Sequence, residues 1–214
     1  LDNFQGGGVL FSARYNHALE RIGVFDPRLS FGLDWRKFRR LEMTGTPPTV
    51  LYNEIVVLPL SVTYAAQGKF AASDLNANVS YSVNLPEMGK GKEADFAAYD
   101  QVNATQPKPA YKVLRYGMNY SQQLWDEWLF RTALNGQWSR DVLIQGEQMR
   151  LGGADAIRGF SEGSEGGATA VRLNLEGYTP DFGEGDFRIR ALAFYDFGKA
   201  KPTYGARNAI AGAG

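Results

Sequence analysis

Stretches in which apolar and polar residues alternate one by one run through most of this chain. Side chains of a β-strand point alternately to its two faces, so this pattern predicts strands with one apolar and one polar face. The stretches are about 11 to 15 residues long, whereas strands of globular proteins average roughly 5 to 6. We expect strands at 8–18, 28–38, 53–65, 70–84, 110–122, 127–138, 168–179 and 187–198. The predicted fold class is all-β.

The segment EWLFRTALNGQWS illustrates the two faces. Trp128, Phe130 and Leu134 fall on one side, and Arg131 and Asn135 fall on the other. Two architectures are built from such strands: a soluble sandwich with an apolar inner face, and a membrane barrel with an apolar outer face and a polar lumen. The lengths favour the barrel, because a tilted spanning strand needs about 9 to 11 residues.

Aromatic residues near the strand ends suit the interfacial girdles of a membrane barrel. These residues are Tyr15, Trp35, Trp125, Trp128, Trp138, Tyr178 and Tyr195. Aromatic packing inside a sandwich explains them almost as well, so they leave both architectures open.

The connections between the expected strands largely alternate between short and long, as in outer-membrane barrels with short turns at one end and long loops at the other. The short links are 66–69 and 123–126, with 180–186 intermediate, and the long ones are 39–52, 85–109 and 139–167. The link 19–27 is longer than a tight turn. Counting RDVLIQGEQMRLGG as a strand would move 85–109 to the short-turn end, so we interpret all of 139–167 as one loop.

Composition argues against several functional classes. The 23 basic and 23 acidic residues balance, which gives no reason to expect a nucleic-acid partner. Cysteine is absent and His17 is the single histidine, so neither a thiolate nucleophile nor a cysteine or histidine metal site is expected. We expect no enzyme activity, no cofactor and no metal. The closing AIAGAG indicates an interrupted strand, and hence a fragment of a longer protein.

Two motifs in the last third of the chain carry a specific signal through their order and spacing. The first is LGGADAIRGF, with Gly152 and Gly153 before the tip residues Ile157, Arg158, Gly159 and Phe160. The second is FYDFG, which contains Phe194, Asp196 and Gly198. One amphipathic hairpin separates them. In this arrangement the chain resembles the two-partner secretion transporters, also called the haemolysin activation/secretion (TpsB) family.

The resemblance implies a transmembrane antiparallel β-barrel in the bacterial outer membrane, of which residues 1–214 form part of the C-terminal barrel domain, about eight of about sixteen strands. Family members also carry periplasmic POTRA domains, which this chain lacks. The loop at about 139–167 is then a lid that folds into the lumen, where Arg158 pairs with Asp196 and the glycines permit sharp turns. The alternation independently turns Phe194 and Asp196 to the polar face, beside Arg188 and Arg190.

The implied function is translocation of an unfolded, haemolysin- or adhesin-like exoprotein by a monomeric barrel surrounded by outer-membrane lipid. Two alternatives stay open. A barrel assembly factor that inserts other outer-membrane proteins would share both motifs. A soluble β-sandwich that binds carbohydrate through exposed aromatic residues would share the alternation.

Overall fold

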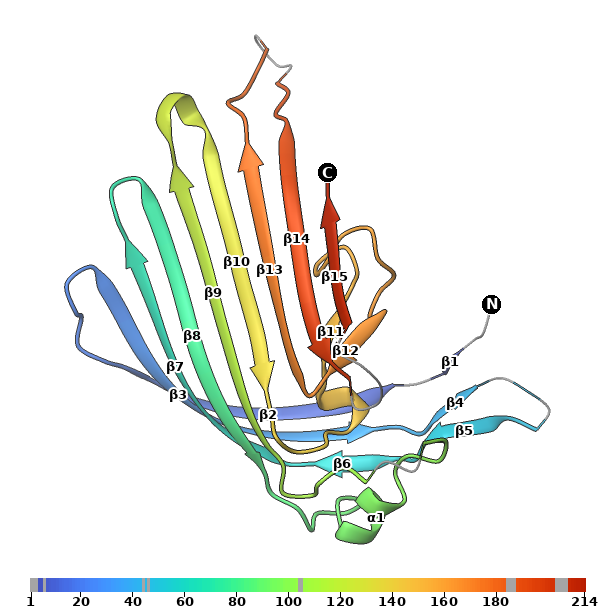
Figure 1. Ribbon diagram of the computed structural model, residues 1–214. Coiled ribbons are helices and arrows are strands. Elements are labelled where there is room, and N and C mark those ends of the chain that lie inside the picture. Colours follow the sequence, from blue (N-terminus) through green and yellow to red (C-terminus); the bar gives the residue numbers. More distant parts are fainter. Residues whose placement is uncertain are drawn as a thin grey trace.

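The computed structural model describes residues 4–5, 7–43, 45, 47–103, 106–183, 188–202 and 208–214. Its main feature is one curved antiparallel sheet of ten strands in the order β15-β14-β13-β10-β9-β8-β7-β3-β2, with β6 also paired to β3 (Figure 1). The strands are β2 (Gly8–Ala18), β3 (Phe25–Phe38), β6 (Ile55–Val57), β7 (Pro59–Lys69), β8 (Ser73–Asn84), β9 (Lys112–Gln123), β10 (Leu129–Trp138), β13 (Thr169–Tyr178), β14 (Leu192–Lys201) and β15 (Asn208–Ala213).

The smaller elements lie in the connections. A three-stranded sheet is formed by β1 (Phe4–Gln5), β4 (Leu41–Met43) and β5 (Thr49–Tyr52). The helix α1 (Glu93–Ala97) lies between β8 and β9, and the 3-10 turn η1 (Trp125–Glu127) lies between β9 and β10. The segment between β10 and β13 holds the 3-10 turn η2 (Gln145–Glu147) and a hairpin of β11 (Met149–Leu151) and β12 (Glu165–Gly167). Among the described residues, no helix is long and apolar enough to cross a membrane.

Six of the eight predicted strand regions coincide with strands to within a few residues, the region 53–65 is divided and the region 187–198 is displaced. In the divided region β6 and β7 follow each other along β3, with a break at Leu58, whose N–H donates to the Asn84 side chain at 2.7 Å. Strand β3 begins at Phe25, where a bridge to Ile22 shortens the expected 19–27 link. The AIAGAG stretch belongs to a further strand, β15, which pairs with β14.

The last predicted strand, 187–198, is displaced toward the C-terminus, because β14 begins at Leu192. Residues 184–187 lie outside the described part of the chain. They include the end of the predicted 180–186 link and the first residue of the predicted strand. Arg190 pairs with Asp181 at 2.8 Å in the stem of the hairpin that precedes β14. The expected position of Arg188 and Arg190 beside Asp196 is therefore wrong, since both precede the strand.

The two faces of the sheet differ as the alternation predicts. Six residues on the convex face of β3, β7 and β8 are 39–45% exposed: Phe31, Leu33, Val62, Tyr64, Val79 and Tyr81. Their neighbours on the concave face are polar, and Thr63 donates to Ser80 there at 2.8 Å. Tyr178 also lies on the concave face, where its hydroxyl donates to Glu176. The girdle interpretation is wrong for Tyr178, because its register places it on the polar side of β13.

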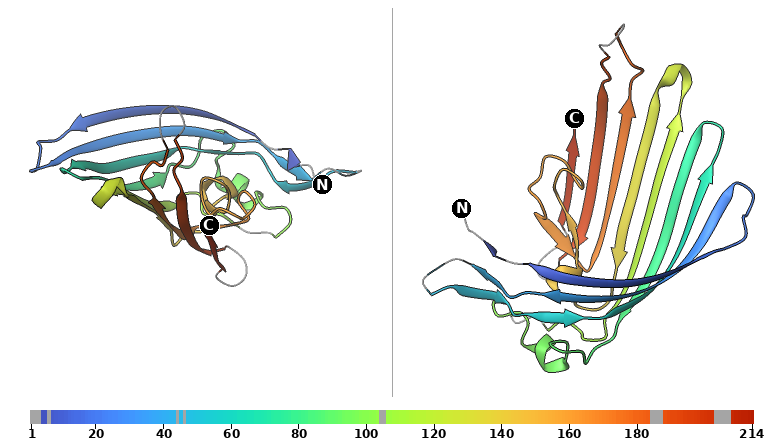
Figure 2. Two further views of the ribbon diagram at one scale, coloured as in Figure 1. Left: turned by 90° about the horizontal axis from the view of Figure 1, so that it is seen from above. Right: turned by 180° about the vertical axis from the view of Figure 1, so that it is seen from behind.

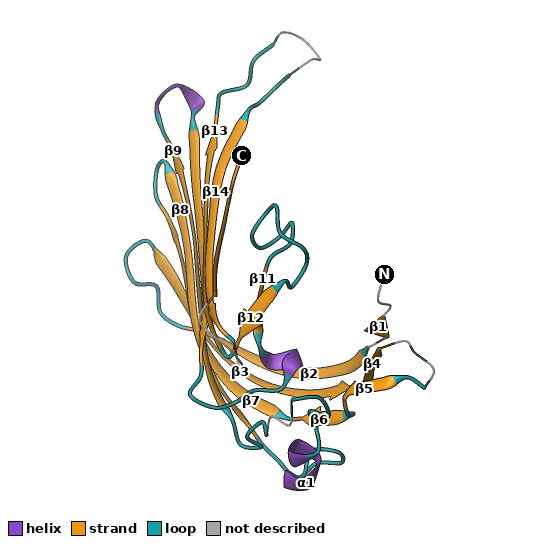
Figure 3. Ribbon diagram, turned by 45° about the vertical axis from the view of Figure 1, so that its right-hand side comes forward, coloured by secondary structure: helices purple, strands orange, loops and turns teal. Residues whose placement is uncertain are grey.

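The long connections gather at one end of the sheet and the turns at the other (Figure 1). At the long-loop end they share one hydrophobic core, which joins β6, α1, the start of β9 and the segment after β10. Its buried members are Ile55, Val57, Phe96, Tyr99, Tyr111, Val113, Leu143 and Ile144. The view from above shows the sheet curving around the hairpin of β11 and β12 (Figure 2). This hairpin stands on the concave side (Figure 3).

Candidate functional site

We call the segment between β10 and β13 the lid, and its distal part, residues 152–164, the tip. Tight turns shape it, since Gly152, Gly153 and Gly159 have φ values of 84°, 113° and 87°. Only glycine adopts such angles without strain. The Gly153 N–H donates to the Phe160 carbonyl at 3.0 Å and closes the tip on itself. The predicted turn glycines therefore lie where the backbone reverses.

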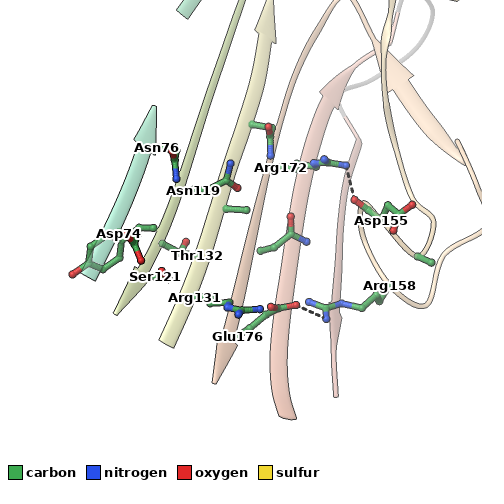
Figure 4. A pocket seen from close by; sticks show the side chains of 15 residues that line it. Asp74, Asn76, Asn119, Ser121, Arg131, Thr132, Asp155, Arg158, Arg172 and Glu176 are labelled. Atoms are coloured by element: carbon green, nitrogen blue, oxygen red, sulfur yellow. Dashed lines mark hydrogen bonds and ion pairs between the residues drawn. The ribbon is translucent and has the colours of Figure 1, made fainter. Parts of the chain in front are cut away.

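Arg158 at the tip meets two carboxylates of the sheet, Asp196 and Glu176, and Figure 4 shows its contact with Glu176. Its Nε and Nη2 donate to the two oxygens of Asp196 on β14, each at 2.7 Å, and Nη1 donates to Glu176 on β13 at 2.8 Å. The Arg158 backbone N–H adds a bond to Asp196 at 3.0 Å. The planar guanidinium matches a carboxylate through two parallel bonds, which a lysine cannot do.

Burial strengthens this contact. The Asp196 side chain is 0% exposed and that of Arg158 is 23% exposed. The Asn174 amide donates to Asp196 at 2.8 Å and to the Ala156 carbonyl at 2.6 Å. It therefore joins the lid to the concave face of the sheet, which we call the wall. Hydrogen bonding to Asp196, and then to Glu176, raises the pKa of Arg158 above its ordinary value. Arg158 is therefore a permanent cation in this position.

The FYDFG residues that flank Asp196 also contact the tip. The Phe194 ring lies 3.7 Å from the guanidinium carbon of Arg158, which is a cation–π contact. Gly198 leaves room for Ile157, because a Cβ on this glycine would lie 2.2 Å from the Ile157 Cδ1. Ile157 is fully buried there in a cluster with Leu151, Ala170 and Ala200.

No contact of the Phe160 side chain with the sheet is found among the described residues. Phe160 is 36% exposed and has no ring contact within the described part of the chain. Its contribution to the tip is the backbone bond to Gly153.

A second contact between lid and wall was not predicted. Glu147 in η2 is buried, and its carboxylate accepts from Arg36 on β3 at 2.6 Å and from Arg115 on β9 at 2.9 Å. The sequence signal for it is weak: an acidic residue in a loop, and arginines on the polar faces of two strands. Nothing local connects residues that lie 111 and 32 positions apart.

Between the tip and the wall lies a polar hollow of about 720 Å³ (Figure 4). Amide and charged side chains line it, including Asn76, Asn119, Arg131, Arg172 and Glu176. Arg172 donates to the Asp155 carbonyl of the tip at 2.9 Å. Such a surface offers hydrogen-bond donors and acceptors without an apolar pocket for a particular side chain.

Residues 14–214 match the family described as haemolysin secretion/activation protein ShlB/FhaC/HecB. This chain belongs to that family. The family's members are two-partner secretion transporters, which are β-barrels of the bacterial outer membrane. The expected family and the expected localisation are therefore confirmed.

Curated relatives of this ShlB/FhaC/HecB chain include the heme/hemopexin transporter protein HuxB of Haemophilus influenzae. One HuxB sequence is 29% identical over 105 residues, which cover 48% of this chain and 18% of the relative. That of strain 86-028NP is 27% identical over 134 residues, which cover 62% and 21%. The chain thus spans about a fifth of the length of these relatives.

Two solved structures are similar in fold to this ShlB/FhaC/HecB chain. CdiB from Escherichia coli superposes with a TM-score of 0.75 at 20% identity, covering 98% of this chain and 39% of CdiB. CdiB from Acinetobacter baumannii gives 0.66 at 13% identity, covering 94% and 33%. The predicted fold, a fragment of an all-β barrel, is confirmed. The chain therefore does not have the alternative fold, a soluble β-sandwich.

Proposed function

We propose that the protein containing this chain carries an unfolded exoprotein through its lumen to the cell surface, without covalent chemistry. The observation that carries the proposal is a lid that Arg158 fixes to the polar concave face of the sheet, in a chain of the ShlB/FhaC/HecB family. An extended polypeptide presents a donor and an acceptor at every residue. The hollow beside the tip offers complementary amides and charges whatever the client's side chains.

Within this proposal, residues 1–214 are about half of a sixteen-stranded C-terminal barrel domain, and client-recognising POTRA domains lie elsewhere in the protein. The barrel acts as a monomer, with its convex apolar face against outer-membrane lipid. Ile157, Arg158 and Gly159 hold the tip on Phe194, Asp196 and Gly198, so that the lid obstructs or shapes the channel. Gly152 and Gly153 give the tip its turns, and Phe160 stays exposed toward the lumen.

Site-specific photo-cross-linking in the full-length protein tests the path of the client. A cross-linking amino acid at Asn119, which lines the hollow, is expected to capture the exoprotein during secretion. The same amino acid at Met118 serves as the control, because the adjacent position faces the opposite side of β9. Equal capture at both positions, or capture at neither, would contradict passage along this wall.

Charge placed on the two faces tests the membrane orientation. Leu134→Lys puts an ammonium group on the convex face of β10, where lipid contact costs about 2–4 kcal/mol at the bilayer midplane. Asn135→Lys puts the same group into the polar lumen at little cost. We expect poor membrane assembly only for Leu134→Lys, measured as the fraction of heat-modifiable barrel on gels. Equal assembly of both variants would show that the convex face does not contact lipid.

A further inference from the structure

The lid has a second buried charge contact, with the polarity of the first one reversed. At the tip a lid arginine meets wall carboxylates, whereas at Glu147 a lid carboxylate meets wall arginines. The Glu147 side chain is 0% exposed. Its two oxygens are occupied by different arginines, Arg36 at 2.6 Å and Arg115 at 2.9 Å. We call residues 141–148, which carry this contact, the root of the lid.

Glu147 connects strands that are not neighbours. Strands β3 and β9 are separated in the sheet by β7 and β8, which is about 14 Å along the sheet at the usual strand spacing. Their arginines converge on one carboxylate because the sheet curves around the lid. Gln137 of β10 accepts from Arg115 at 2.8 Å and donates to the Glu147 carbonyl at 2.9 Å, so a third strand joins the contact.

The rest of the root is fixed in place as well. Leu143 and Ile144 lie in the core of the long-loop end. Asp141 accepts from the Lys108 ammonium and from the Lys112 N–H, both at 2.9 Å. Burial opposes the ionisation of Asp141, but these bonds outweigh it and lower its pKa. The root thus depends on β3, β9 and the loop that precedes β9.

The tip depends on a different part of the wall. Arg158 binds Asp196 and Glu176 on β14 and β13, and Ile157 packs with Leu151, Ala170 and Ala200. The side-chain partners of Arg158 and of Glu147 do not overlap. Contacts without shared partners behave nearly independently in free energy.

We propose that Glu147 is a positioning residue that holds the root of the lid on the wall independently of Arg158, so that the tip can leave the wall while the root stays. This inference goes beyond the proposed translocation. It concerns the order in which the lid detaches, and a measurement without any client tests it, so its failure is distinguishable from failure of the proposed function.

Thiol labelling with a membrane-impermeant maleimide tests the proposal in the full-length protein, in a background free of other cysteines. Two buried reporters are used in separate proteins: Leu143→Cys in the root and Ile157→Cys in the tip. Glu147→Gln is expected to raise labelling at position 143 by about tenfold or more and to leave position 157 unchanged. The amide retains one acceptor oxygen and turns its NH₂ toward an arginine donor, which breaks the contact.

Arg158→Ala is expected to give the opposite pattern, with labelling at 157 and protection at 143. Glu162→Gln is the matched control, because it makes the same chemical change in the same lid at a carboxylate whose one hydrogen bond among the described residues is with the Ala154 N–H. Glu147→Asp keeps the charge but is too short to reach both arginines, so intermediate labelling is expected at 143. If Glu147→Gln fails to assemble, Arg115→Gln removes one partner and tests the same contact.

Labelling of both reporters in either variant would overturn the proposal, since the lid would then detach as one unit. Protection of position 143 in Glu147→Gln and in Arg115→Gln would overturn it equally.

Discussion

Alanine in place of Arg158 is expected to leave the barrel assembled and to reduce secretion of the client by about tenfold or more. The substitution removes four side-chain contacts: two bonds to Asp196, one to Glu176 and the packing against Phe194. Asp196 would remain buried without a cation, which is the costly half of a broken ion pair, so the tip would leave its place. Secreted client, quantified per assembled barrel, measures the effect.

Arg158→Lys separates charge from geometry. The ammonium group retains the positive charge but cannot form the parallel pair of bonds, so intermediate secretion is expected. Arg140→Ala is the control, since Arg140 belongs to the same connection and stacks on Trp138 without an acidic partner among the described contacts. Secretion at the wild-type level by Arg158→Ala would contradict a role for this contact in translocation.

Valine at Gly198 is expected to displace the tip without touching any charge. The space above this glycine is filled by Ile157 and by Leu151, whose Cδ1 atoms would lie 2.2 Å and 3.0 Å from the new Cβ. Overfilling a packed site costs about 1–3 kcal/mol, and the tip can relieve it by moving away from β14. We expect secretion to fall as in Arg158→Ala, with thiol labelling at position 157 raised.

Gly177→Val is the matched control, because a Cβ at Gly177 on the adjacent strand meets no atom within 4 Å. Both glycines lie inside strands, so the loss of glycine itself is the same in the two variants. Equal secretion by the two valine variants would show that secretion does not depend on the packing of Ile157 against Gly198.

The long strands and the two faces of the sheet could be predicted because alternation is a local property of the chain. The ends of the strands could not. Alternation continues through Arg188 and Arg190, but the ladder of β14 begins only at Leu192, after a stem in which Arg190 bonds Asp181. Likewise the sequence predicts one strand over 53–65, although the structure divides it at Leu58, whose N–H donates to the Asn84 side chain.

The two lid contacts differ in the same way. Arg158 and Asp196 were identified because family motifs mark them, and the alternation placed Asp196 on the polar face. Glu147 carries no such mark, and its partners come from β3 and β9. A contact of this kind depends on how far the sheet curves, and the order of residues does not encode that curvature locally.

The shared hydrophobic core of the long-loop end bears on which of its residues can vary. Outer-membrane barrels have short periplasmic turns and longer extracellular loops. Residues 87–90 are exposed at that end, whereas Phe96, Tyr99 and Tyr111 pack against Leu143 and Ile144 of the lid. We expect sequence variation at this end to be confined to its exposed residues, because a substitution in the core beneath them would disturb the attachment of the lid.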